Sequence, residues 1–126
     1  MKLADFLLNR NTAQTTKVTL TGELAEYEFE IRALNNDEWE NCRSQCMNFN
    51  KNGSVSLNNA KLNAMIVVTG CVNPNFRSAE LLAKAGITLP IDFVNKVLKP
   101  GEVEKLANQI LQYSGFGDNL GEIQKK

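Results

Sequence analysis

The chain reads Glu-Tyr-Glu-Phe-Glu-Ile-Arg at residues 26–32, so Tyr27, Phe29 and Ile31 alternate with charged side chains. This period of two predicts a β-strand with one face toward the core and the other toward solvent. Residues 16–21 show the same alternation, and a glycine stands between the two stretches. Together they predict an antiparallel β-hairpin near the N-terminus, with the three apolar side chains on its dry face.

Helical spacing of apolar residues dominates the rest of the chain. A short amphipathic helix or ordered arm is expected at residues 2–9, with Leu3, Phe6 and Leu7 on one side. The stretch 64–68 is apolar nearly all round and predicts the most buried helix of the fold. Asparagine and serine caps, prolines at helix starts and glycines after helix ends set the boundaries. Helices after the hairpin are expected at about residues 36–49, 57–72, 78–86, 88–98 and 100–115.

These elements predict an α+β fold, mostly α, in which the N-terminal β-hairpin packs on a bundle of four or five helices. The length of 126 residues fits one domain, which we expect to span residues 1–126. Residues 118–126 contain few apolar side chains and are expected to fray.

The composition excludes several classes of partner. Fourteen Lys and Arg residues balance fourteen Asp and Glu, so no net field attracts nucleic acid or anionic lipid. The longest apolar run, residues 64–68, is far shorter than the roughly 20 residues that cross a bilayer. The N-terminus has no signal-peptide pattern. We therefore expect a cytoplasmic protein without nucleic-acid or membrane partners.

The residues that carry most enzyme chemistry are missing or badly placed. The chain contains no histidine and no glycine-rich phosphate loop, so the usual bases and nucleotide sites are absent. Cys42, Cys46 and Cys71 lack a fourth ligand for zinc and are expected to be buried free thiols. The acids at residues 37–40 suit the start of a helix. We predict no catalytic residue, no cofactor and no metal site, and hence no enzyme.

A partner could instead bind an apolar helix face. The last helix carries an apolar stripe that either belongs to the core or lines a groove for another protein. Leu106 and Ile110 favour the core, whereas Val103 and Tyr113 fit either role. The residues predicted to contact a partner are Val103, Leu106, Ile110, Tyr113 and Phe116.

Several motifs, taken in order, resemble the XkdN-like tail assembly chaperone family of prophages and phage-like elements in Gram-positive bacteria. The match rests on their order and spacing, because each motif alone is common. Phe76 stands where the family usually has leucine, and Leu82 where it usually has glutamine. The motifs are Leu-Ala-Asp-Phe-Leu-Leu at 3–8, Glu-Ile-Arg-Ala-Leu at 30–34, Thr-Gly-Cys-Val-Asn-Pro-Asn-Phe at 69–76, Ala-Glu-Leu-Leu at 79–82 with Gly86, and Lys-Val-Leu-Lys-Pro-Gly-Glu at 96–102 with Gly115-Phe116.

The resemblance implies a chaperone that holds the tape measure protein during tail assembly in the host cytoplasm and is absent from the mature virion. The tail tube protein and further copies of the chain are additional partners under this interpretation. The alternative is a structural tail or connector component retained in the virion.

The resemblance also implies a longer product made by ribosomal frameshifting near the end of the gene. Gln124-Lys125-Lys126 is compatible with a slippery codon run there. A solvated, frayed polar tail is the simpler explanation of the same tripeptide, since tails of this composition are common at domain ends.

Overall fold

A computed structural model describes residues 2–9 and 15–116 of the chain. The predicted N-terminal hairpin is confirmed: β1 (Thr15–Thr19) and β2 (Glu28–Arg32) pair antiparallel, joined through a 3₁₀ turn at Gly22–Leu24. A third strand, β5 (Cys71–Asn73), pairs antiparallel with the other edge of β2, giving the order β1-β2-β5. This strand was not predicted from the sequence, and its first two residues were expected to belong to a helix.

The alternation in β2 orients the sheet as predicted for two of its three apolar residues. Phe29 and Ile31 are buried, while Glu28 is exposed and Val18 of β1 lies opposite Phe29. Tyr27 precedes the strand and its side chain is 63% exposed. The prediction for Tyr27 was wrong because the alternating pattern extends one residue beyond the paired backbone.

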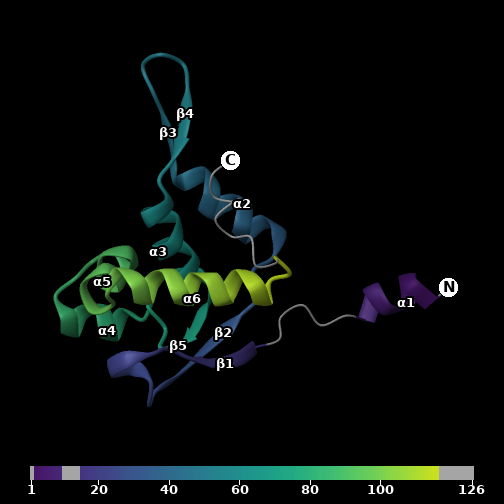
Figure 1. Cartoon of the computed structure of the whole chain (residues 1–126), viewed down its shortest axis with the longest axis horizontal. Coiled ribbons are helices and arrows are strands. Elements are labelled where there is room, and N and C mark those ends of the chain that lie inside the picture. The colour runs from purple at the N-terminus through teal and green to yellow at the C-terminus, as the bar shows by residue number, and fades with distance from the viewer. Residues whose placement is uncertain (1, 10–14, 117–126) are drawn as a thin grey trace.

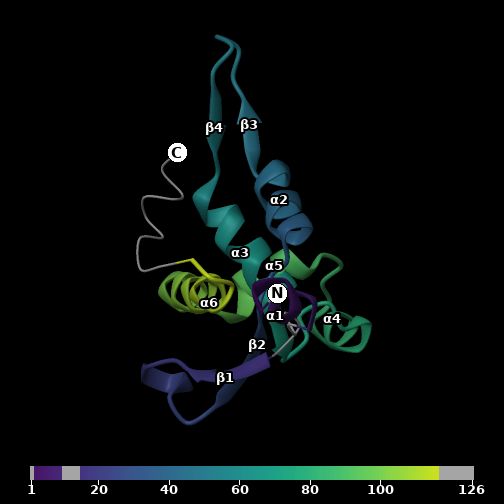
Figure 2. The ribbon, with the colours of Figure 1, turned by 90° about the vertical axis from the view of Figure 1, so that its right-hand side faces the viewer.

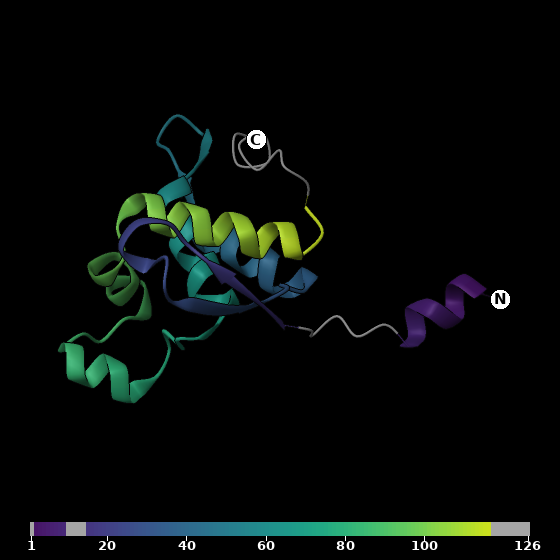
Figure 3. The ribbon, with the colours of Figure 1, turned by 60° about the horizontal axis from the view of Figure 1, so that its bottom comes forward.

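Helix α1 (Lys2–Asn9) precedes the N-terminal hairpin, and five helices follow it within the described residues. They are α2 (Asn36–Gln45), α3 (Asn59–Gly70), α4 (Ala79–Ala85), α5 (Pro90–Val97) and α6 (Pro100–Tyr113). Figures 1 and 3 show α6 running across α3, with the sheet against them. The α+β class, mostly α, is confirmed.

The helix ends follow the chemistry expected of their residues. Asn35 forms a capping box with Glu38 at the start of α2. At the end of α6, Gly115 adopts a positive φ of 102°, and the N–H of Phe116 donates to the carbonyl of Leu111. The Phe116 ring then lies 4.9 Å from the ring of Trp39. Phe116 therefore folds back over the end of the helix.

Two helix boundaries were predicted too far along the chain. The helix expected to reach residue 49 ends at Gln45, and residues from Met47 onward form a second hairpin, β3 (Met47–Phe49) and β4 (Val55–Leu57). The helix expected at 57–72 starts at Asn59 and ends at Gly70. In both cases strand pairing replaces the helical hydrogen bonds that the residue spacing would allow.

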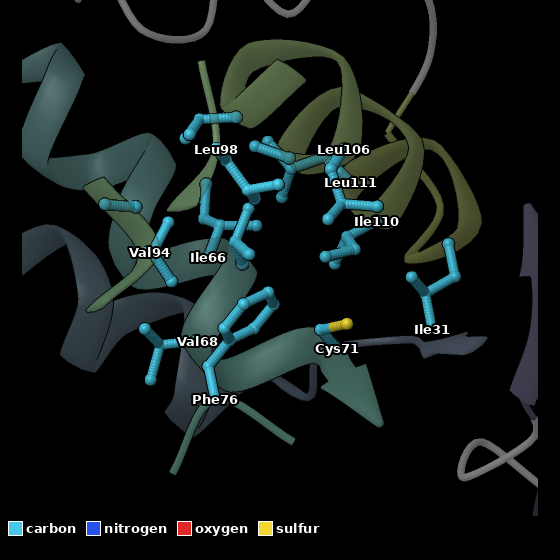
Figure 4. Packing of buried hydrophobic residues seen from close by; sticks show 14 of the residues in the cluster. Ile31, Ile66, Val68, Cys71, Phe76, Val94, Leu98, Leu106, Ile110 and Leu111 are labelled. Atoms are coloured by element: carbon cyan, nitrogen blue, oxygen red, sulfur yellow. The ribbon is translucent and has the colours of Figure 1, made fainter. Parts of the chain in front are cut away.

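The core lies where α3, α5 and α6 meet over the sheet. Figure 4 shows side chains from these three helices pointing toward a common centre, among them Ile66, Val94 and Leu106. The apolar stripe of α6 is buried at Val103, Leu106, Ala107, Ile110 and Leu111. The apolar stretch 64–68 of α3 is buried as well, apart from half-buried Met65. Val97 of α5 is 49% exposed. The predicted frayed tail and the Gln-Lys-Lys tripeptide lie outside the described residues.

Candidate partner-binding surface

The five residues predicted to contact a partner fall into two groups in the structure. Val103, Leu106 and Ile110 are buried in the core formed by α6, α3 and α5. Tyr113 and Phe116 lie half-buried at the end of α6, where Tyr113 Oη donates a 3.4 Å hydrogen bond to the carbonyl of Thr15. In this conformation Tyr113 and Phe116 have side-chain surface to offer to another protein, whereas Leu106 and Ile110 have none.

Val103 also backs a small cavity at the start of α6. The cavity has a volume of about 350 Å³ and lies between the N-terminal half of α3, the end of α5 and the start of α6. Leu98, Pro100 and Val103 supply apolar walls, and the amides of Asn63 and Asn95 supply polar ones. This space could hold one apolar side chain of a partner.

An exposed apolar surface also lies on the β3–β4 hairpin. Its two registered pairs are Met47 opposite Leu57 and Phe49 opposite Val55, which places all four side chains on one face. We call these four residues the hairpin face. Phe49 is 81% exposed and Val55 51% exposed, and none of the four is buried. Figures 1 and 2 show the hairpin projecting away from the helices and the three-stranded sheet.

Local hydrogen bonds define the hairpin from base to tip. At the base, Asn58 N–H donates to the carbonyl of Cys46 at 2.9 Å. At the tip, the backbone N–H groups of Asn50 and Gly53 donate to the carbonyls of Ser54 and Asn50. Gly53 has a φ of +86°, a conformation that favours glycine.

The hairpin is longer than the connection requires. Helix–helix connections usually take about 2 to 8 residues, whereas this one runs from Cys46 to Asn58. An isolated two-stranded hairpin adds little to the stability of its domain. An exposed apolar face on such an element indicates a binding role.

The sequence did contain a signal for this element. Met47-Asn48-Phe49 and Val55-Ser56-Leu57 both alternate apolar and polar residues around an Asn-Gly tip. The signal was missed because Phe49 also continues the helical spacing of Trp39, Cys42 and Cys46.

The predicted N-terminal helix is confirmed as α1 and offers a second exposed apolar face. Leu3, Phe6 and Leu7 lie on one side, as expected, and none of the residues of α1 is buried. Leu8 is exposed as well. Figures 1 and 3 both draw α1 apart from the remaining helices.

Charge is concentrated at the start of α2. Arg32 donates through both terminal nitrogens to the two carboxylate oxygens of Glu38, one of these contacts measuring 2.8 Å. Glu38 also accepts from the backbone N–H of Asn35 at 3.0 Å. The hydrogen bonds from Arg32 hold the pKa of Glu38 below its ordinary value, despite partial burial that acts in the other direction. The same pair raises the pKa of Arg32.

Glu38→Gln is expected to reduce the free energy of unfolding by about 1 kcal/mol at neutral pH, because a charge-assisted hydrogen-bond pair becomes a neutral one. The folded-state pKa of Glu38 is lowered, so its stabilisation is present above the ordinary carboxyl pKa and is lost as the pH falls through the lowered value. Urea unfolding of both proteins between about pH 7 and pH 3 measures the difference.

Glu40→Gln is the matched control, because Glu40 is exposed and only forms a 3.4 Å surface pair with Arg43. Its effect should be small at every pH. A Glu38→Gln deficit that persists unchanged at the acid end would contradict the assigned role of the Glu38 charge.

The thiols behave as buried side chains. Cys42, Cys46 and Cys71 are free and buried, and burial raises the pKa of each, that of Cys71 to about 12. A thiol with a raised pKa is a poor nucleophile at neutral pH. Within the described residues, no group of three His, Cys, Asp or Glu side chains is placed to hold a metal ion. No helix in that part of the chain is long and apolar enough to span a bilayer.

Comparison with known proteins identifies a family whose sequence model matches this chain. The sequence model of the phage XkdN-like tail assembly chaperone proteins matches residues 3–126. The crystal structure of the protein YqbN has a TM-score of 0.67 to this chain at 19% sequence identity, covering 89% of this chain and 95% of that one. At this identity the likeness concerns the fold alone. No curated protein matches the chain.

Proposed function

This chain belongs to the phage XkdN-like tail assembly chaperone family, and from that premise we propose that it holds the tape measure protein, without catalysis, while the tail is built. Membership of the family supports a role in tail assembly carried out by contact with other proteins. That the partner is the tape measure protein is our inference from what tail assembly requires. A long helical protein has apolar faces that must be covered until tube subunits surround it.

The observation that supports this proposal best is the hairpin face. Met47, Phe49, Val55 and Leu57 present a continuous apolar strip on an element that projects from the domain. An amphipathic helix can bury its apolar stripe against such a strip. The half-buried pair Tyr113 and Phe116 is a further candidate contact at the end of α6.

The expected affinity is modest. Burying a large apolar side chain yields about 1.5–3 kcal/mol, and the hairpin face has four such residues, of which Leu57 and Met47 are already partly covered. Association also costs rigid-body and side-chain freedom, which removes much of this gain. Modest affinity suits a chaperone of which many copies bind one long partner. The growing tube subunits must also be able to displace these copies.

The test is co-expression of the tape measure protein of the same phage with the wild-type chain or with the double variant Phe49→Ser/Val55→Ser. We expect the wild-type chain to keep the tape measure protein in the soluble fraction and to co-purify with it. The double variant should lose most of this effect yet unfold at the wild-type urea concentration, since both side chains are largely exposed.

Asn48→Ser/Ser56→Thr is the control on the opposite face of the same hairpin. It should bind as the wild type does. If the serine double variant folds and still solubilises the tape measure protein fully, the hairpin face is not its binding surface.

We further propose that the chain acts in the host cytoplasm and leaves before the particle is complete. Mass spectrometry of purified particles distinguishes this from a structural subunit of the tail or connector. A chaperone should be absent or far below one copy per tail, whereas a structural subunit should be present at a fixed ratio to the tube protein. The tube protein and a second copy of the chain are additional candidate partners, and pull-down with each tests them.

A further inference from the structure

A second cavity lies at the opposite end of α3 from the β3–β4 hairpin. Its volume is about 360 Å³, and Arg32, Thr69, Asn75 and Arg77 supply its polar lining. The remaining lining consists of Val68, Cys71 and Val72. The fold brings these residues together from β2, the end of α3, β5 and the turn before α4.

The two arginines of this cavity differ in what they already bind. Arg32 is committed, because its terminal nitrogens donate to Glu38 and to the carbonyl of Ala33. Arg77 donates one hydrogen bond, from Nη2 to Thr69 Oγ1 at 3.2 Å. Guanidinium has five N–H donors, so most of those of Arg77 are not used by the contacts seen among the described residues.

Arg77 is an exposed residue whose side chain is anchored at one nitrogen, on the hydroxyl of Thr69. The Asn75 side chain accepts from the backbone N–H of Arg77 at 3.0 Å, which fixes the turn from which the arginine extends. Thr69, its side-chain partner, is buried at the end of α3 and also lies 3.6 Å from Cys42 Sγ. An arginine positioned in advance loses less side-chain freedom when it binds a ligand.

The cluster of Arg32, Arg77 and Glu38 has a net charge of +1. Arg32 and Arg77 contribute two positive charges, and Glu38 contributes one negative charge. The pKa of Glu38 is also lowered by the charge of Arg77, which agrees with their proximity. None of the ion pairs among the described residues includes Arg77.

We propose that this cavity binds a carboxylate group of a protein partner, with Arg77 as the cation that pairs with it and the valine and cysteine side chains beside it covering the adjoining carbon atoms. Arginine pairs with a carboxylate through two parallel N–H···O bonds. A phosphate fits less well, because only one guanidinium is free and half of the lining is apolar. The carboxylate belongs either to an acidic side chain or to the end of a partner chain. This inference goes beyond the proposed function and does not depend on the hairpin face.

Heteronuclear NMR titration of the whole ¹⁵N-labelled chain tests the proposal. The probes are N-acetylglutamic acid α-amide, which carries only a side-chain carboxylate, and N-acetylvaline, which carries only a terminal one. We expect saturable shifts of the backbone amides of Thr69, Val72 and Arg77 with at least one probe. The probe that binds more tightly identifies the source of the carboxylate. Inorganic phosphate should bind more weakly than that probe.

Arg77→Gln should weaken binding about tenfold or more. Arg77→Lys keeps the charge but loses the forked donors, and we expect it to bind more weakly than the wild type as well. Lys84→Gln removes one positive charge from an exposed site on α4 and should leave the affinity unchanged. If the Arg77→Gln chain does not fold, the affinity of the Arg77→Lys chain for the carboxylate probe tests the proposal on its own. No saturable shift with either probe, tighter binding of phosphate, or wild-type affinity in either arginine variant would overturn the proposal.

Discussion

Leu106→Ala is expected to lower the free energy of unfolding by about 2–5 kcal/mol, and Leu106→Asp to leave the chain unfolded at room temperature. Leu106 has no exposed surface and lies on the face of α6 that packs against α3. Alanine would remove buried carbon and leave a cavity, while aspartate would place an unpaired charge there. A domain of this size has a total stability of about 5–15 kcal/mol, so either change is a large fraction of it. Urea unfolding followed by circular dichroism gives the values.

The control is Glu104→Ala, an exposed position on the same helix, which should change stability by less than about 0.5 kcal/mol. The Leu106 experiment also separates the two roles left open for α6 by the sequence. If Leu106 belongs to the core, the Leu106→Asp chain does not fold. If Leu106 instead lines a binding groove, the Leu106→Asp chain folds but no longer pulls down the tape measure protein. A Leu106→Asp chain that is stable and still binds would exclude both roles.

Much of the fold could be predicted because its signals are local. The hairpin of β1 and β2 follows from strict alternation around a glycine, and the caps at Asn35 and Ser78 act within one helical turn. The stripe along α6 repeats often enough to fix its buried face. In each case the residues that decide the structure lie within a few positions of one another.

The elements that were missed depend on contacts distant in sequence. β5 is a strand of three residues, and it exists because its backbone pairs with β2, for instance Cys71 with Ile31. The β3–β4 hairpin competes with continuation of α2, and residues 46–49 alone fit both. The strand partners beyond the tip decide the outcome. Periodicity does not reveal which of two competing pairings forms.

The candidate surfaces were harder to predict than the fold. An apolar stripe on a helix is the same pattern whether it faces the core or a partner, so the residues of α6 could not be assigned from their spacing. The hairpin face emerges only when two strands are paired in register. Arg32 and Arg77 look like scattered single charges in the sequence, and the fold brings them to one cavity.

The packing of α3 against α6 requires glycine at position 70, and no sequence pattern predicts this requirement. Gly70 is the last residue of α3 and is buried where α3 meets α6. A Cβ atom added to Gly70 would lie 2.6 Å from Cγ2 of Ile110 and 3.1 Å from its Cδ1. Carbon atoms do not approach so closely, and Ile110 is itself fully buried, so neither helix can yield without moving its neighbours.

Gly70→Ala is therefore expected to destabilise the domain by about 1–3 kcal/mol through overpacking, although alanine favours helix over glycine. Ile110→Ala alone should cost about 2–5 kcal/mol because it leaves a cavity. In the double variant the new methyl group occupies part of that cavity, so the combined loss should be smaller than the sum by about 0.5–3 kcal/mol. Gly101→Ala is the control, because nothing lies within 4 Å of its added Cβ, and it should be neutral or slightly stabilising. Strictly additive losses in urea unfolding would mean that Gly70 and Ile110 do not restrict one another, and that the close approach of α3 to α6 is not what requires glycine here.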